Sequence, residues 1–492
     1  MKKYHILPLI MAALIVLLAS LGVASSGVDS SPVDVNAGCG RVPIASPSGL
    51  GSGPVVFQAA IPAALALDPY SIDEDDAKRM VDNFAWETFL ALNWSASFVC
   101  RGTPADHTLR DASPTDWTSA RVWETYKAPY ELFQVSDSDW NPANISFDDP
   151  APTGACGSLA GSNGGPQKRL LYESVQAGFA TKGALVDQQE NIVWYEILIN
   201  RDSFDYIRDN GWAATGAYSY KGPLSGISSV DFPTSQNGAT GAGSMEIKAS
   251  WREMTDDDDQ SRYFTREAIT YDGSSCTSVT VGLVGMHIIR KIDNAPKWIW
   301  MTFEHEDNVP KAGTTGDGRD YNFWSLSCAQ DAPSDCWAQV AITDEAYYCC
   351  PNLLTSPEYN INQVTRLIPI QANTELNDKY RGAFARMNSP FQYFVLVGAQ
   401  WAKPQGATPQ AWKRPCNPNG PWSVQPPDPG EPCYEQIPEF LRNTSMETYT
   451  VQTDGTGTQN TTDSCMNCHI AGAVDGSFLW QDAMDNQYEV SD

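Results

Sequence analysis

Apolar positions recur with two different periods along the chain, and these periods predict helices in some segments and strands in others. Ser71 is expected to cap the first helix, Pro129 interrupts the second, and Gly211 ends the third. The expected helices cover residues 71–93, 121–133 and 202–210. The expected strands cover residues 168–174, 191–199, 244–251, 279–292, 297–305, 365–370 and 391–399.

The two longest expected strands, residues 279–292 and 297–305, are separated by the turn sequence Asp293-Asn294-Ala295-Pro296, which predicts a β-hairpin. Strands outnumber helices in this pattern, and neighbouring strands follow each other closely. We therefore expect a β-rich α+β fold, in which residues 61–400 form one large mixed domain with an antiparallel sheet and a short C-terminal extension follows.

Both ends of the chain differ in composition from this domain. Residues 1–24 have two lysines, an apolar run and a small-residue site, as in a secretory signal peptide; a retained membrane anchor is the alternative. Residues 25–60 are predicted to be a flexible leader, and residues 401–437 a proline-rich segment stapled by a disulfide. Residues 438–492 form the last segment. We expect a periplasmic or secreted protein without a stable membrane span after signal cleavage.

The net charge of the chain limits the classes of molecule that it is expected to bind. Among 492 residues, 59 are Asp or Glu and 32 are Lys or Arg, which gives a formal net charge of −27. A surface this acidic repels the phosphate backbone, so nucleic-acid binding is not expected, and a basic protein partner is favoured. The 16 Trp, 20 Tyr and 17 Phe suit sheet faces and flat pockets.

The chain has 12 cysteines, which in an exported protein predict disulfides. Close spacing suggests Cys328 with Cys336 and Cys416 with Cys433. The remaining connectivity stays open, because spacing alone does not determine it.

Two cysteines have a different pattern. Residues 465–469 read Cys-Met-Asn-Cys-His, the C-x-x-C-H signature of c-type haem attachment. In this chemistry Cys465 and Cys468 form thioethers to one porphyrin, and His469 is the proximal axial ligand of the haem iron. A disulfide or half of a zinc site is the alternative, but no second C-x-x-C or H-x-x-x-H accompanies the motif. Since only 23 residues follow His469, we expect the haem to pack against the preceding domain or to stay partly open.

The sixth ligand of such an iron has several candidates. Met446 and Met484 are the nearest methionines, and His107, His287 and His305 are the remaining histidines of the mature chain. For each methionine an ordinary apolar contact is the alternative. An open or water-ligated iron is also compatible with the sequence.

A speculative second metal site is formed by Glu246, His287 and His305, which lie on neighbouring expected strands. Register decides this hypothesis, because side chains alternate between the faces of a strand. A four-residue hairpin loop places His287 on the face of Glu304 and opposite to His305, whereas an odd-length loop brings both histidines together. The favoured alternative is that all three are buried, hydrogen-bonded residues of the sheet.

Taken together, these segments resemble exported bacterial proteins described as cytochrome c family proteins. The resemblance lies in Glu87–Trp94, Val122–Thr125, Gly243–Trp251, Val281–Ile288, Trp300–His305 and Ser464–His469. It implies one covalent haem c held by Cys465, Cys468 and His469, and it implies no substrate.

The expected function is electron transfer through this haem to a redox partner protein. One alternative is an oxidoreductase, in which the large domain is catalytic, with or without a metal, and the haem is the electron outlet. The other is a haem-based module that binds a small gas. No phosphate-binding loop, dinucleotide fingerprint or G-x-S-x-G elbow suggests another chemistry.

Overall fold

The structure is a computed structural model, and everything below concerns the residues it describes. These residues are 39, 41–97, 99–105, 119–133, 142–150, 156, 169–175, 184–214, 216–219, 221–226, 230–272, 274–311, 317–331, 361–404, 434–437, 440–449, 465–466, 469 and 474–485. The expected signal peptide, most of the proline-rich segment, His107 and Cys468 lie outside them. Residues from Cys39 onward form one compact unit.

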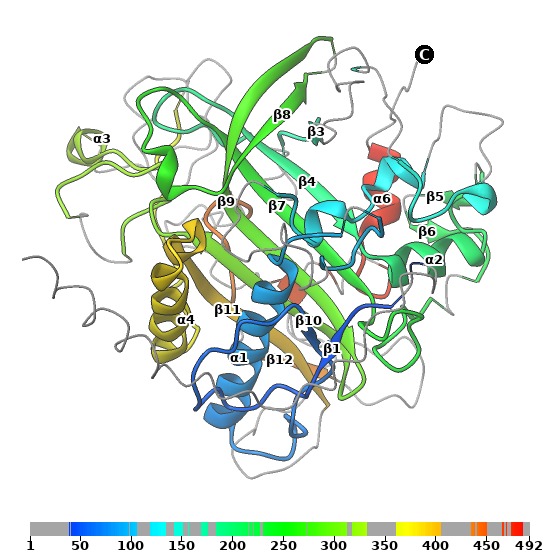
Figure 1. Ribbon diagram of the computed structural model, residues 1–492. Helices are drawn as coiled ribbons and strands as arrows, with labels where there is room; N and C mark the ends of the chain where they lie inside the picture. Colours follow the sequence, from blue (N-terminus) through cyan, green and yellow to red (C-terminus); the bar gives the residue numbers. More distant parts are fainter. Residues whose placement is uncertain are drawn as a thin grey trace, which may run out of the picture. The chain divides into compact units, whose positions relative to one another are not determined.

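A large sheet organises this unit (Figure 1). Within the described residues it has eight strands, six of them in the order β12-β11-β10-β9-β7-β4, while β8 pairs with β9 and β3 pairs with β8. The strands are β3 (Arg169–Leu171), β4 (Val193–Ile199), β7 (Met245–Glu253), β8 (Thr265–Tyr271), β9 (Cys276–Ile292), β10 (Ala295–His305), β11 (Phe394–Pro404) and β12 (Tyr434–Ile437). All pairs in this sheet are antiparallel except β3 with β8, so the predicted β-rich α+β class is confirmed.

The other elements are short or lie outside this sheet. Two small strand pairs are β1 (Ile44–Ala45) with β2 (Ile61–Pro62) and β5 (Tyr218–Ser219) with β6 (Gly222–Pro223). The α-helices are α1 (Glu74–Leu92), α2 (Arg201–Asp209), α3 (Leu326–Asp331), α4 (Thr374–Arg386) and α6 (Leu479–Asp485). Short 3-10 turns occur at Trp123–Thr125, Pro129–Glu131, Pro142–Asn144, Gln260–Arg262 and Pro390–Tyr393.

The hairpin of β9 and β10 forms as predicted and defines the two faces of the sheet. Ile292 pairs with Ala295, and after a bulge Thr302 pairs with His287. Side chains alternate between faces, so Lys248, His287, Trp300, Thr302 and Gln400 share one face, which we call the C-terminal face. Trp251, Met286, Phe303 and Ala399 share the other, which we call the helical face.

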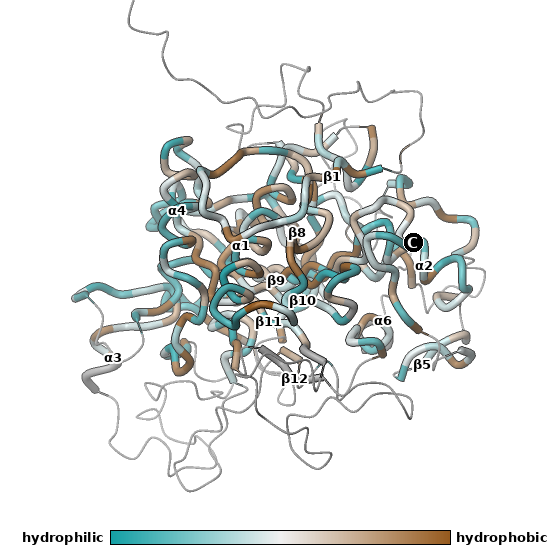
Figure 2. Tube along the Cα trace, turned by 90° about the horizontal axis from the view of Figure 1, so that it is seen from below, coloured by the Kyte–Doolittle hydropathy of each residue, from teal (hydrophilic) through white to brown (hydrophobic). Residues whose placement is uncertain are grey.

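Helices α1 and α4 cover the helical face (Figure 1). Phe89 of α1 stacks on Phe303 of β10 with ring centroids 4.3 Å apart, and Trp86 packs edge-on against the same ring at 5.0 Å. Tyr380 of α4 stacks on Trp86 at 5.2 Å. Aromatic rings therefore join both helices to the sheet, and the apolar residues concentrate along these elements (Figure 2).

The C-terminal part of the chain lies on the opposite face. Asn443 donates from Nδ2 to Thr302 Oγ1 at 2.9 Å, and the backbone N–H of Met466 donates to Gln400 Oε1 at 2.9 Å. Both acceptors belong to the C-terminal face. Residues 440–449, 465–466, 469 and 474–485 thus belong to the same compact unit as the sheet.

Several local predictions need correction. Asp73 rather than Ser71 caps α1, because its side chain accepts from the backbone N–H of Asp75. The expected helix at 121–133 is reduced to two 3-10 turns, the second of which begins at Pro129. Residues 365–370 form no strand, and Pro369 within them has no N–H to donate to a sheet.

Disulfides tie the N-terminal segment and β9 to other parts of the fold. Cys39 bonds to Cys100 and Cys156 bonds to Cys276. Residues 41–60 of the expected leader are therefore part of the fold, since they follow this first disulfide and contain β1. Cys328 is also disulfide-bonded, but its expected partner Cys336 lies outside the described residues, as do Cys416 and Cys433.

Candidate haem-attachment site

His469 lies over the C-terminal face beside Trp300, with ring centroids 6.0 Å apart. It is helical and half-buried, and the ring of Phe478 lies 4.8 Å away. Its Nδ1 is 2.7 Å from the carbonyl oxygen of Gly476. Because a carbonyl only accepts, Nδ1 carries the proton of the neutral ring and Nε2 keeps its lone pair.

Burial keeps this ring neutral. It lowers the pKa of His469 to about 4, although the hydrogen bond to Gly476 acts in the opposite direction. Metal-bound histidines commonly donate their second ring N–H to a backbone carbonyl, which fixes the tautomer and the ring orientation. His469 therefore has the tautomer and the support that an axial ligand needs.

The first cysteine of the motif lies in the same segment. Cys465 is half-buried, packs against the main apolar core and carries a thiol rather than a disulfide. Its Sγ is 3.8 Å from the carbonyl oxygen of Leu441. The next residue, Met466, is fully buried and anchors the segment to the sheet. Cys468 lies outside the described residues, so the site contributes one placed thiol and the histidine.

The carbonyl that holds His469 belongs to a tight turn. Val474 and Ser477 exchange backbone hydrogen bonds of 3.2 and 3.0 Å, and the two residues between them have positive φ, 47° at Asp475 and 79° at Gly476. A Cβ on Gly476 would lie 2.9 Å from the Trp298 ring, so a side chain there is excluded. Sequence reasoning missed this turn, although Asp-Gly is a strong turn signal.

A polar cluster lies further along the C-terminal face. His287 is 6% exposed, and its Nε2 lies 3.1 Å from Glu447 Oε1, off the direction of a well-aligned hydrogen bond. Burial works to raise the pKa of Glu447, but its interactions with His287, Lys248 and the backbone N–H of Asn443 outweigh burial, and the pKa lies below its usual value. The same three residues act electrostatically on His469. The cluster and the motif histidine therefore share one region of the face.

A small, open pocket adjoins this cluster. Glu304, fully buried next to it, accepts hydrogen bonds from the backbone and hydroxyl of Thr444 at 2.6 and 2.8 Å and forms an ion pair with Arg366. The pocket is lined by Val364, Thr365, Arg366, Leu367, Ile368, Arg442, Asn443, Thr444, Glu447 and Thr448.

His305 lies on the helical face, on the opposite side of β10 from His287. Of the two arrangements left open by the sequence, this is the one given for the four-residue loop, although the turn itself has only two residues, Asp293 and Asn294, and a bulge precedes the pairing of Thr302 with His287. The structure therefore does not bring Glu246, His287 and His305 together. Within the described residues no group of three or more metal-binding side chains is found.

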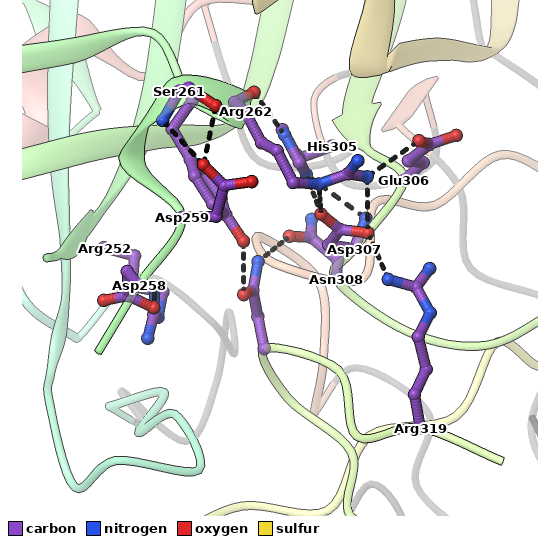
Figure 3. Close-up of polar contacts among 12 residues, drawn as sticks. Arg252, Asp258, Asp259, Ser261, Arg262, His305, Glu306, Asp307, Asn308 and Arg319 are labelled. Carbon is purple, nitrogen blue, oxygen red and sulfur yellow. Dashed lines mark hydrogen bonds and ion pairs between the residues drawn. The ribbon is translucent and has the colours of Figure 1, made fainter. Parts of the chain in front are cut away.

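The surroundings of His305 satisfy both of its ring nitrogens. Nε2 donates to the carbonyl oxygen of Arg262 at 3.0 Å, and Nδ1 accepts from the backbone N–H of Asp307 at 3.2 Å. Tyr263 stacks on the ring at 4.3 Å, and burial lowers the pKa of His305 to about 4. Figure 3 shows Asp307 joining Arg262 and Arg319 beside it. His305 is thus a neutral structural residue.

The structure places the candidate sixth ligands of the iron in different parts of the fold. Met446 is 2% exposed and packs in a second apolar cluster with Tyr195, Val284 and Val364, whereas Cys465 and Met466 pack with the first. This is the ordinary apolar contact that was the alternative for Met446. Met484 lies in α6, but its side chain is outside the described atoms. Of the described histidines, His287 is the one that shares a face with His469.

Comparisons with protein-family models, with curated proteins and with solved structures find no match for this chain. In the described residues, no helix has both the length and the apolar character needed to cross a membrane. The function therefore has to be argued from the geometry around His469.

Proposed function

We propose that the chain carries one haem c, attached through Cys465 and Cys468 with His469 as the proximal ligand, and that it transfers electrons to a redox partner in an exported compartment. When bound, the haem supplies an iron that gains and loses one electron. The observation that carries the proposal is the hydrogen bond from His469 Nδ1 to the Gly476 carbonyl, which leaves Nε2 available as a ligand directly after the second motif cysteine.

The chain's own residues have two roles in this proposal. The turn at 474–477 orients the imidazole, and the packing of Cys465 and Met466 on the sheet holds the attachment segment in place. Trp300 and Phe478 flank the histidine with apolar rings, which limits the access of water and so influences the reduction potential. The disulfides at Cys39–Cys100 and Cys156–Cys276 support an oxidising compartment.

Covalent attachment is the direct test. The full chain, produced together with a c-type haem maturation system, is expected to gain the mass of one haem and to keep it after denaturation. Cys465→Ala combined with Cys468→Ala should lose the haem, while Met446→Leu should keep it. A wild-type chain with no covalent haem would contradict the proposal.

The visible spectrum of the reduced protein, taken before and after addition of CO, then separates the roles of the haem. An unchanged spectrum indicates two protein ligands and favours an electron carrier. Formation of a CO complex indicates an open site and favours gas binding or catalysis at the iron.

A second candidate is an oxidoreductase that passes electrons from a small donor to the haem, and such a donor would enter at the small, open pocket beside Glu447. Thr448→Trp should fill this pocket. The enzyme is favoured if the wild type oxidises small alcohols, aldehydes or amines with ferricyanide as acceptor, and Thr448→Trp abolishes that turnover while the haem spectrum stays unchanged. Absence of turnover with all of these donors favours the carrier.

A further inference from the structure

The turn that holds His469 is itself held by the β9–β10 hairpin. Lys291, at the end of β9, is 1% exposed at its side chain, and its Nζ lies 2.7 Å from Asp475 Oδ2. The same oxygen accepts from the backbone N–H of Phe232 at 2.7 Å. Asp475 directly precedes Gly476, the residue whose carbonyl accepts from His469. The Lys291 ammonium and the Phe232 N–H thus fix Asp475, the residue next to that carbonyl.

A second contact holds the turn from β10. The indole N–H of Trp298 donates to the backbone carbonyl of Asp475, and its ring lies against Gly476. Lys291 also forms an ion pair with Asp231, which is largely exposed. The side chain of Asp475 is 8% exposed, and burial raises its pKa although Lys291 acts to lower it. The contact is therefore a buried ion pair, in which each partner depends on the other.

We propose that Lys291 is a positioning residue for the haem iron: through Asp475 it fixes the Gly476 carbonyl, and through that carbonyl it sets the tautomer and orientation of His469. This inference rests on the proposed function for its effect on the haem. The contact chain from Lys291 to His469 exists without the haem and can be tested separately.

The physical effect follows from the hydrogen bond. An imidazole that donates a strong N–H···O=C bond is more basic at its other nitrogen and stabilises the oxidised iron. Loosening the turn weakens this bond and raises the reduction potential. Loss of the positive charge of Lys291 acts in the opposite direction, because a nearby cation favours the reduced iron. The sign of the shift therefore distinguishes positioning from simple charge.

The first experiment uses Lys291→Met in the haem-loaded full chain. The reduction potential, measured by redox titration, is expected to rise, and the electron paramagnetic resonance signal of the oxidised iron is expected to change. Lys291→Arg keeps the charge and the ion pair and should restore both wild-type values. Lys379→Met is the matched control, since Lys379 also donates to a backbone carbonyl, at Gly51, but lies on α4. A lowered or unchanged potential in Lys291→Met would overturn the inference.

Trp298→Phe provides a second variant in case Lys291→Met does not fold. It removes the donor to the Asp475 carbonyl without changing any charge, and it should also raise the potential. An unchanged potential and resonance signal in folded Trp298→Phe would contradict the proposed control of His469 by the hairpin.

The haem-free chain, Cys465→Ala with Cys468→Ala, separates this inference from the proposed function. Its histidines, labelled with nitrogen-15, are expected to show His469 protonated at Nδ1 alone. Addition of Lys291→Met should produce a mixture of tautomers. An unchanged single tautomer would overturn the inference even if the haem is present in the loaded protein, and a wild type without haem would overturn the function while leaving this result intact.

Discussion

Several ionisable side chains are fully buried in this fold, and their surroundings shift their pKa values in opposite directions. Glu124 lies between Arg169 and Arg266, whose charges outweigh the cost of burial and lower its pKa to about 2. Asp82 on α1 accepts a backbone hydrogen bond from Asn373, and the Ala399 backbone and the charge of Lys78 also act to lower its pKa. Burial raises the pKa of Asp82 to about 7. The first carboxyl therefore stays ionised at neutral pH, while the second is near its titration point.

Asp82 predicts a specific pH dependence of stability. The folded state holds its proton up to about pH 7, whereas the unfolded chain releases it near the ordinary value of 3.8. The contribution of Asp82 to stability is fully present below about pH 4 and is lost as the pH rises to about 7. Asp82→Asn should remove this loss, which is on the order of 4 kcal/mol. Urea unfolding between pH 4 and 8 measures it.

The matched control is Asp378→Asn on the exposed side of α4, which should follow the wild-type profile. Parallel pH profiles for the wild type and Asp82→Asn would show that Asp82 is ionised throughout.

A second prediction at this scale concerns His305. His305→Phe keeps a ring next to Tyr263 but leaves the Arg262 carbonyl and the Asp307 N–H without their partner. The free energy of unfolding should fall by about 1–3 kcal/mol, while the metal and haem content stays unchanged. Thermal unfolding and metal analysis of the same preparation check both statements. Loss of a bound metal would instead assign His305 to a metal site.

Strand β9 pairs with three other strands, β7, β8 and β10. It also presents His287 and Lys291 to the C-terminal segment. Gly285 of β9 lies where this segment approaches most closely. A Cβ there would lie 2.4 Å from Ser445 Oγ and 2.6 Å from Ser250 Oγ. These hydroxyls are 2.8 Å apart and Ser445 also donates to Asn443, so neither moves freely.

Gly285→Ala should therefore displace residues 443–445 from the sheet. We expect a loss of about 1–3 kcal/mol in the free energy of unfolding and faster proteolysis of the C-terminal segment. Gly49→Ala is the control, because a Cβ at that position meets nothing within 4 Å. Equal stability of the two variants would show that the segment is not held against Gly285.

Some of the observed helices and strands could be predicted from the sequence, and others could not. The β9–β10 hairpin could be predicted from the alternation of side chains and the turn sequence at Asp293, whereas the opposite orientation of His287 and His305 was one of two alternatives that only the observed register decides. Helix α4 was missed, although Asn373 caps it. The packing of residues 440–449 on the sheet was not predictable, because that contact joins residues 141 apart in the chain and depends on glycines that have no periodic signal.

At the scale of the whole molecule, two disulfides connect distant parts of the chain. Cys156–Cys276 spans 120 residues, and Cys39–Cys100 spans 61. Cys156 is 2% exposed and packs against Ile269 of β8, so this disulfide also fills part of a small apolar cluster.

Removal of Cys156–Cys276 by paired alanine substitution should lower the free energy of unfolding by about 2–4 kcal/mol. Removal of Cys39–Cys100 should cost about 0.6 kcal/mol less on loop length alone, because its loop is half as long. Denaturant unfolding of both double variants measures the difference. A larger loss for Cys39–Cys100 would show that strain or packing outweighs loop entropy here.

The position of residues 440–449 and 474–480 on the C-terminal face has a consequence for the order of biosynthesis. The strands that form this face, β7, β9, β10 and β11, end at Pro404, so the ribosome completes them before it makes the segment that covers them. Until then, Trp300 lacks the ring of His469, and Trp298 lacks its contacts with Asp475 and Gly476. The nascent protein thus passes through a stage in which these aromatic rings are more exposed to other chains than in the folded protein.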